Sequence, residues 1–116
     1  MLRSLGASAR SGGPAVQTIS PVDAHAVDDA YIIDVREADE VARARIDGAV
    51  HIPLGELVSR VDEVPRDRTV YLLCAVGGRS AQATQYLAAQ GVDAVNIDGG
   101  IVGWYRAGLP VTTSAD

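Results

Sequence analysis

The chain has 116 residues, 47% of them apolar, which is enough for one compact domain with a core and too few for two domains. All ten basic residues are arginines and they are outnumbered by fifteen acidic residues, so at a formal net charge of −5 a nucleic-acid partner is not expected. The sequence contains no stretch that resembles a membrane span.

The first predicted element is an N-terminal tail. Residues 1–14 are rich in Ser, Gly, Ala and Arg and contain no acid, which is typical of a flexible segment, so we expect the folded domain to span residues 15–116. The tail lacks the apolar core of a secretory signal, while a transit segment, a cloning remnant and a native tail all fit its composition. We expect a cytoplasmic protein.

Short apolar or β-branched runs then alternate with helical patterns, which is typical of β-α units around a mostly parallel sheet. The predicted strands cover residues 16–19, 31–35, 49–52, 69–73 and 93–97. The predicted helices begin behind the N-cap Ser20, cover residues 37–45, 54–61 and 80–90, and end with a short helix that carries Trp104. These elements predict an α/β fold with three layers, α/β/α, around a central, mostly parallel sheet of five strands.

Cys74 is the only cysteine, and it opens a loop between a strand and a helix. It follows the apolar run 69–73, and the loop continues through two glycines to Arg79 before the predicted helix start at Ser80. Glycines allow such a turn to aim backbone N–H groups inward, and the following helix adds its positive dipole end. Both effects favour a thiolate, so the pattern predicts a reactive cysteine and not a small buried hydrophobe.

Ligands of open α/β sheets gather at the carboxyl ends of the strands, where Asp34 also lies. For Asp34 and Arg36 we favour an ion pair or a cap at the strand end over contact with substrate. Arg79 has two open roles, which can coexist: it ties the loop to an acid such as Asp34, and it contacts an anionic substrate. His51 is interpreted as a strand residue and not as a general base.

Four segments resemble the rhodanese family of sulfurtransferase-type domains, in order over roughly residues 16–110. The loop CAVGGRS is similar to the family's CxxGxRS pattern. The other three segments resemble the family's Asp-x-Arg-Glu strand end, its Gly-Ala pair before an Ile-Pro turn, and its Gly-Gly and tryptophan finish: residues 32–37, residues 48–54, and residues 97–100 with Trp104. Arg45 and Ala75 depart from the family, because many relatives carry a histidine and a long polar residue at these positions.

The resemblance implies sulfur transfer. Cys74 would take a sulfane sulfur from thiosulfate or a similar small anionic donor, hold it as a persulfide, and pass it to a thiol or cyanide. No metal and no organic cofactor are expected. The residues implied for substrate binding are Ala75, Val76, Gly77, Gly78 and Arg79, and those implied for support are Asp34, Arg36 and Ser80.

Two alternatives remain open. The first is a persulfide carrier, or a non-enzymatic rhodanese-like binding module, that serves a protein partner. The second is a cysteine phosphatase or arsenate reductase, because related phosphatases of this fold use a Cys-x5-Arg loop. From Cys74 to Arg79 this chain has Cys-x4-Arg, and the narrower ring of N–H groups suits a sulfur atom better than a phosphate.

Overall fold

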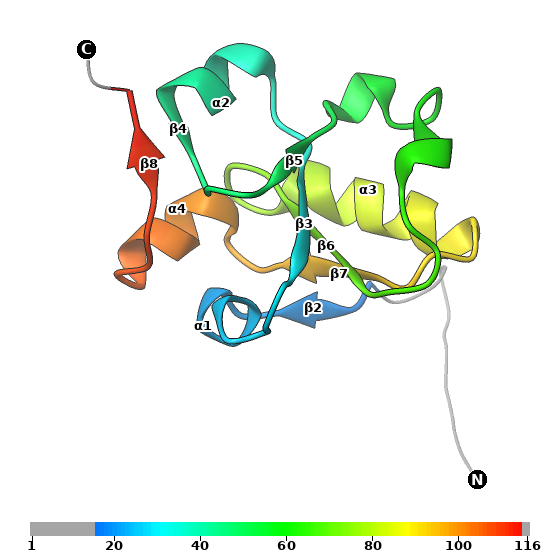
Figure 1. Cartoon of the computed structure of the whole chain (residues 1–116), viewed down its shortest axis with the longest axis horizontal. Coiled ribbons are helices and arrows are strands. Elements are labelled where there is room, and N and C mark those ends of the chain that lie inside the picture. Colours follow the sequence, from blue (N-terminus) through cyan, green and yellow to red (C-terminus); the bar gives the residue numbers. More distant parts are fainter. Residues whose placement is uncertain (1–15, 115–116) are drawn as a thin grey trace, which may run out of the picture.

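The computed structural model describes residues 16–114, so the tail predicted at residues 1–14 lies outside the described residues. A sheet of five strands has the order β2-β7-β6-β3-β5, and every pairing in it is parallel (Figure 1). Its strands are β2 (Thr18–Ile19), β3 (Tyr31–Asp34), β5 (Val50–His51), β6 (Val70–Leu73) and β7 (Ala94–Ile97). The predicted α/β class with a five-stranded, mostly parallel sheet is confirmed.

Helices cover both faces of the sheet. Helix α3 and the segment that contains η2 and η3 pack on one face, and α1 and α4 pack on the other. The helices are α1 (Pro21–His25), α2 (Ala38–Arg43), η2 (Leu54–Glu56), η3 (Val61–Glu63), α3 (Gly78–Ala89) and α4 (Gly100–Arg106). Ser20 caps α1 as predicted, since its hydroxyl accepts the Asp23 N–H at 3.1 Å.

The central strand β6 contributes side chains to two hydrophobic clusters, one on each face of the sheet. Val70, Leu72 and Cys74 belong to the cluster under α3, whereas Tyr71 and Leu73 belong to the cluster under α1 and α4. This alternation follows from the two-residue period of a strand, and apolar side chains on both sides are what a buried parallel strand requires. Cys74 continues the alternation, so its side chain is directed toward the side of the sheet that α3 covers.

The predicted helix at residues 37–45 is too long at its C-terminal end. Helix α2 ends at Arg43, and β4 (Ala44–Arg45) pairs antiparallel with β8 (Thr112–Thr113) in a separate two-stranded sheet that the sequence did not indicate. The pairing partner lies more than sixty residues further along the chain, so a local pattern contains no information about it. Two-residue strands are also too short to show a period of two.

The helix predicted at residues 54–61 is wrong. The segment instead forms the two short 3-10 helices η2 and η3, joined by turns. Pro53 precedes it, Gly55 weakens helical backbone, and the β-branched Val58 and Val61 lose side-chain freedom in a helix. Short 3-10 turns accommodate these residues without a continuous α-helical ladder.

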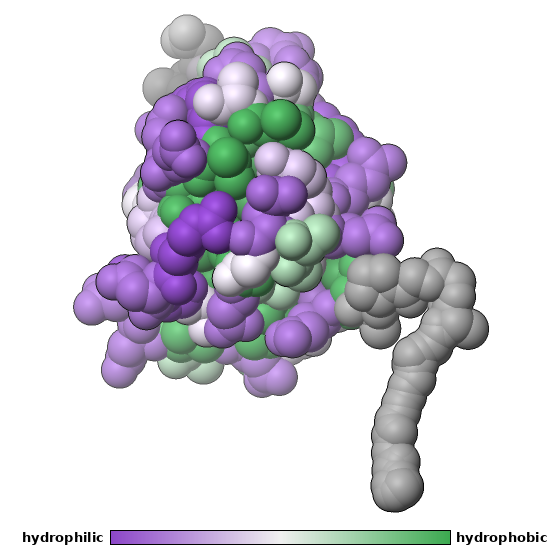
Figure 2. Space-filling view, turned by 90° about the vertical axis from the view of Figure 1, so that its right-hand side faces the viewer, coloured by the Kyte–Doolittle hydropathy of each residue, from purple (hydrophilic) through white to green (hydrophobic). Residues whose placement is uncertain are grey.

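The surface on the side of α3 and the segment 54–64 is mainly hydrophilic. Figure 2 shows this side of the molecule, where a hydrophobic patch lies among hydrophilic residues. Val58, in this segment, is 66% exposed. No helix within residues 16–114 is long and apolar enough to cross a membrane.

Helix α4 is fastened to the chain that leaves β6. The Ile101 N–H donates to the Cys74 carbonyl at 2.8 Å, and the Val102 N–H donates to the Ala75 carbonyl at 3.1 Å. Gly100 makes this approach possible, since it has a φ of +58° and a Cβ there would lie 2.4 Å from the Cys74 oxygen and 2.5 Å from the Ala75 carbonyl carbon. Glycine therefore meets both a conformational and a steric requirement.

We expect Gly100→Ala to destabilise the fold by about 2–4 kcal/mol, because alanine would be strained in the left-handed conformation and its Cβ would also clash with backbone atoms that cannot easily move. Gly48→Ala is the matched control: Gly48 also has a positive φ, +86°, but a Cβ there would meet nothing within 4 Å. Its expected cost is about 1–2 kcal/mol. Urea unfolding of both variants measures the difference, and equal losses would contradict the steric argument.

Candidate active site

Cys74 is the first residue after β6, at the carboxyl edge of the sheet. Its sulfur accepts the Gly77 N–H at 3.0 Å and the Ser80 hydroxyl at 3.2 Å. The residue is only 1% exposed, yet the loop above it is not buried: Val76 is 69% exposed and Gly78 is also exposed. The sulfur therefore lies one layer of residues beneath the surface, among donors, although aliphatic side chains pack around its strand.

Gly77 gives the loop its shape. It adopts a left-handed conformation, with φ 114°, and serves as the N-cap of α3, which begins at Gly78 and not at the predicted Ser80. This turn brings the Gly77 N–H back toward the Cys74 sulfur. The first turn of α3 then adds amides that have no partner within the helix, together with the positive end of the helix dipole.

These surroundings alter the acidity of the Cys74 thiol. Burial is the largest influence and raises its pKa, but it is outweighed by hydrogen bonds from the Ser80 hydroxyl and from the backbone amides of Ser80, Gly77 and Val76, so the net pKa lies below the ordinary value. Donors that favour a charged form lower the pKa of an acid. The site thus favours a thiolate, the nucleophilic form of cysteine.

Arg79 is held by an acid from another element. Its guanidinium makes a two-pronged ion pair with Glu40 of α2, with N–O distances of 2.7 and 2.9 Å. The structure shows the predicted tie to an acid, but the acid is Glu40 and not the suggested Asp34, which is paired with Arg36; contact of Arg79 with an anionic substrate stays a prediction. Glu40 was not anticipated from the sequence.

Glu40 links two elements of the site. One of its carboxylate oxygens also accepts the Glu37 N–H at 2.9 Å, at the start of α2. The hydrogen bond from Arg79 is the main cause that lowers the pKa of Glu40 to about 2; burial opposes it, and the Glu37 N–H makes a smaller contribution in the same direction as Arg79. The loop and α2 are thereby joined by a charged contact at neutral pH.

Asp34 and Arg36 form a buried ion pair at the end of β3, as predicted. The Arg36 Nη2 lies 2.8 Å from Asp34 Oδ2, and it also donates to the Ala44 carbonyl at 2.6 Å. His51 Nε2 lies 2.7 Å from the Arg36 carbonyl oxygen. Because the two buried charges neutralise each other and Arg36 also holds the Ala44 carbonyl, this cluster fixes the strand end beside the Cys74 loop.

A second residue that the sequence analysis missed lies behind the loop. Asn96 of β7 is buried, and its Oδ1 lies 2.5 Å from the Ser80 hydroxyl. Its signal in the sequence is a polar residue inside the otherwise apolar strand Ala94–Ile97, next to the strand that leads to Cys74. Glu40 has a weaker signal, since acids are common in the first turns of helices.

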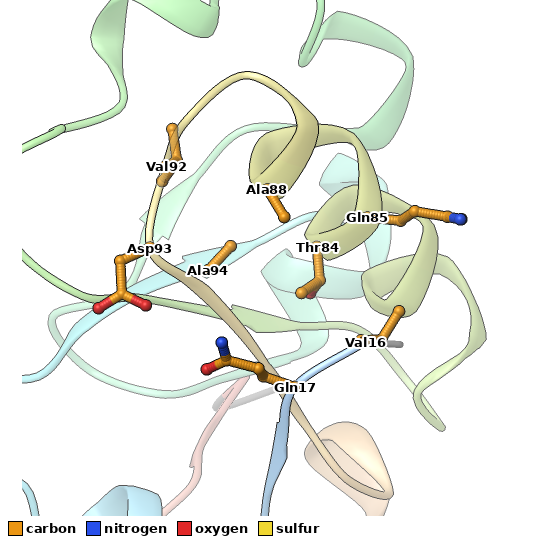
Figure 3. Close-up of a pocket in the computed structure, with 8 residues that line it drawn as sticks. All are labelled: Val16, Gln17, Thr84, Gln85, Ala88, Val92, Asp93 and Ala94. Atoms are coloured by element: carbon orange, nitrogen blue, oxygen red, sulfur yellow. The ribbon is translucent and has the colours of Figure 1, made fainter. Parts of the chain in front are cut away.

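A small cavity lies away from this loop. It has a volume of about 70 Å³, between the later turns of α3 and the start of β7, and Figure 3 shows Thr84 and Ala88 directed from the helix toward Ala94 and Gln17. Pockets for organic ligands are usually roughly 300–1,000 Å³, so this space is too small for one. Among residues 16–114 no group of three or more His, Cys, Asp or Glu side chains is placed to hold a metal ion.

Comparisons with known proteins point in one direction. The family model "Rhodanese-like domain" matches residues 17–107. A protein named sulfurtransferase from Allochromatium vinosum is 40% identical over 85 residues, which are 72% of this chain and 79% of that protein. The thiosulfate sulfurtransferase GlpE of Vibrio cholerae is 33% identical over 86 residues, 73% of this chain and 81% of that protein. The crystal structure of a rhodanese-related protein from Thermoplasma volcanium matches with a TM-score of 0.79 and 34% identity, covering 83% of this chain and 97% of that one.

Glu40→Gln should loosen the loop, because Arg79 loses its charged partner. We expect a loss of about 1 kcal/mol in the free energy of unfolding at pH 7, a modest value because both side chains are partly exposed. The difference from wild type should fade as the pH falls from about 4.5 toward 2, since Glu40 has a lowered pKa in the folded state and its contribution disappears as it is protonated.

Asp39→Asn is the matched control, as it removes the same charge from the same helix at an exposed pair with Arg43. Chemical denaturation between pH 2 and 7 measures both variants. An equal effect of the two substitutions, or a Glu40→Gln effect that does not depend on pH, would contradict the assigned role of Glu40.

Proposed function

From the premise that this chain belongs to the family of rhodanese-like domains, we propose that it is a sulfurtransferase that carries sulfane sulfur on Cys74. The observation that carries the proposal is the position of the Cys74 sulfur, 3.0 Å from the Gly77 nitrogen and 3.2 Å from the Ser80 hydroxyl. The names of its relatives support transfer of sulfur, and that of GlpE supports thiosulfate as the donor.

In the first step the Cys74 thiolate attacks the outer sulfur of thiosulfate. A bond forms between Sγ and this sulfur, and the bond between the two sulfur atoms of thiosulfate breaks, with its electron pair leaving on sulfite. The enzyme then holds a Cys74 persulfide, and the total charge is unchanged. The loop amides from Ala75 to Arg79 stabilise the negative charge as it shifts from Sγ to the outer sulfur of the persulfide.

In the second step an acceptor takes the outer sulfur. A thiolate or cyanide attacks it, the bond to Sγ breaks, and the electron pair returns to Cys74 as thiolate. The sequence holds no other cysteine that could resolve the persulfide within the chain, so an external acceptor is required. The cycle needs neither a metal nor an organic cofactor.

A protein acceptor is a second candidate, favoured by Val76. This apolar side chain is 69% exposed in the loop directly above the sulfur, where it offers a macromolecular partner a contact that a small anion does not need. The domain would then act mainly as a persulfide carrier. Slow turnover with cyanide, together with faster sulfur transfer to a purified protein acceptor, would distinguish the carrier from the small-molecule enzyme.

Treatment of the purified protein with thiosulfate should add the mass of one sulfur atom, and dithiothreitol should remove it. Cys74→Ser should gain no mass and should release neither sulfite from thiosulfate nor thiocyanate in the presence of cyanide. Intact-protein mass spectrometry and a steady-state assay measure the two effects.

Activity that survives in Cys74→Ser would contradict the proposal. Hydrolysis of an aryl phosphate by the same preparation, lost in Cys74→Ser, would support the phosphatase alternative instead. Thermal unfolding of the variant serves as the control for folding, because serine is close to cysteine in size and is expected to be tolerated.

A further inference from the structure

A chain of three side chains leads from the reactive sulfur into the core. The Cys74 sulfur contacts the Ser80 hydroxyl at 3.2 Å, and that hydroxyl contacts Asn96 Oδ1 at 2.5 Å. The other end of the Asn96 amide, Nδ2, lies 3.5 Å from the Gly77 carbonyl oxygen. Ser80 and Asn96 are both buried, at 0% and 6% exposure, so no bulk water competes for these contacts.

The Ser80 hydroxyl has one proton and three acceptors within reach. Besides the Cys74 sulfur and Asn96 Oδ1, the Gly77 carbonyl oxygen lies 3.3 Å from it. The shortest contact is with Asn96, and a hydroxyl that donates there cannot also donate to the sulfur. In that arrangement the hydroxyl oxygen has a lone pair for the S–H of a neutral thiol.

A thiolate requires the opposite direction of hydrogen-bond donation, from Ser80 to Cys74. When the Cys74 proton has gone to solvent, the sulfur needs a donor, and the Ser80 hydroxyl must rotate toward it. The Ser80 oxygen and Asn96 Oδ1 would then face each other at 2.5 Å without a proton between them. A half-turn of the Asn96 amide relieves this conflict, because Nδ2 then donates to the Ser80 oxygen and gives up only the long, 3.5 Å contact with the Gly77 carbonyl.

We propose that Asn96 is a positioning residue that orients the Ser80 hydroxyl toward the Cys74 sulfur when the sulfur carries a negative charge. Its amide has a donor and an acceptor on one planar group, so it can satisfy Ser80 in either direction. When Cys74 is a thiol, Cys74 donates a hydrogen bond to Ser80 and Ser80 donates one to Asn96. When Cys74 is a thiolate, Asn96 donates to Ser80 and Ser80 donates to Cys74. The persulfide anion, whose charge is shared with Sγ, also requires Ser80 to donate a hydrogen bond to Sγ.

The charged groups around the loop make their hydrogen bonds and ion pairs with one another and not with Ser80 or Asn96, although the Cys74 charge adds to the effect of the Glu40 hydrogen bond in raising the pKa of Arg79. Arg79 of α3 is held by Glu40 of α2, Asp34 of β3 is held by Arg36, and His51 of β5 contacts the Arg36 carbonyl. The neutral Ser80 and Asn96 pair is therefore the one whose orientation follows the charge of the sulfur. The inference rests on Cys74 as the reacting sulfur, but it concerns ionisation and can be tested without turnover.

The first test uses the unaltered protein. Asn96 is the only asparagine in the sequence, so selective ¹⁵N labelling gives one side-chain amide group to follow by NMR. Its signals should change with a midpoint equal to that of Cys74, measured from the pH dependence of iodoacetamide alkylation. The change should be absent in Cys74→Ser, and in a uniformly ¹⁵N-labelled sample of wild type the side-chain amide of the exposed Gln82 should not follow it. Asn96 signals that stay constant through the Cys74 titration would overturn the proposal.

The second test separates positioning from simple support of the fold. Asn96→Leu replaces the amide by an apolar group of similar size. Beside a thiol the Ser80 hydroxyl can then still donate to the Gly77 carbonyl oxygen at 3.3 Å, whereas beside a thiolate it loses the Asn96 donor that supports it, so the thiolate fraction falls. Alkylation at a pH below the Cys74 pKa should therefore slow roughly 3- to 10-fold. In a Ser80→Ala background the same substitution should have little effect, since the group through which Asn96 acts is gone.

An equal slowing by Asn96→Leu in both backgrounds, or a loss of stability without any slowing, would overturn the proposal. If Asn96→Leu does not fold, the NMR titration of the unaltered protein decides alone. Loss of sulfur transfer from thiosulfate in a protein that passes both tests would count against the proposed function and not against this role of Asn96.

Discussion

The turn from the end of β6 into the start of α3 sets the direction of the peptide groups from Cys74 to Gly77, which surround the Cys74 sulfur. Left-handed Gly77 directs its N–H inward at 3.0 Å, while the carbonyls of Cys74 and Ala75 point the other way and are taken up by amides of α4. An anion at this place meets donors and is spared repulsion by oxygen atoms. The inward N–H and the outward carbonyls are both needed, because a carbonyl oxygen directed at the sulfur would destabilise an anion there about as much as an N–H stabilises it.

The full charges near the site serve mainly to hold the framework. Arg79 binds Glu40, and Arg36 binds Asp34, so each positive group has a negative partner. In a chain with a net charge of −5, long-range attraction would do little to bring the proposed anionic donor to the loop. Neutral hydrogen-bond donors at short range would therefore have the main part in the proposed recognition, and these act most strongly on a desolvated sulfur.

Local patterns in the sequence predict the sheet and the reactive loop well, because alternation of strands and helices and the glycines around Cys74 are local signals. They do not predict β4 and β8, whose pairing joins distant short segments, nor the 3-10 turns at residues 54–64, where weak helix formers meet tertiary packing. The same limit applies to the site. Glu40 and Asn96 reach the loop from other elements, so their roles depend on contacts that no spacing along the chain records.

The attachment of α4 to the loop affects the order in which the protein acquires its chemistry during synthesis. The amides that hold the Cys74 and Ala75 carbonyls belong to Ile101 and Val102, far downstream on the chain. A nascent polypeptide that has emerged only as far as α3 has the cysteine but not the clamp that orients its peptide groups. The thiol of an incomplete chain is thus left closer to an ordinary cysteine, and its activation waits until the domain is nearly whole.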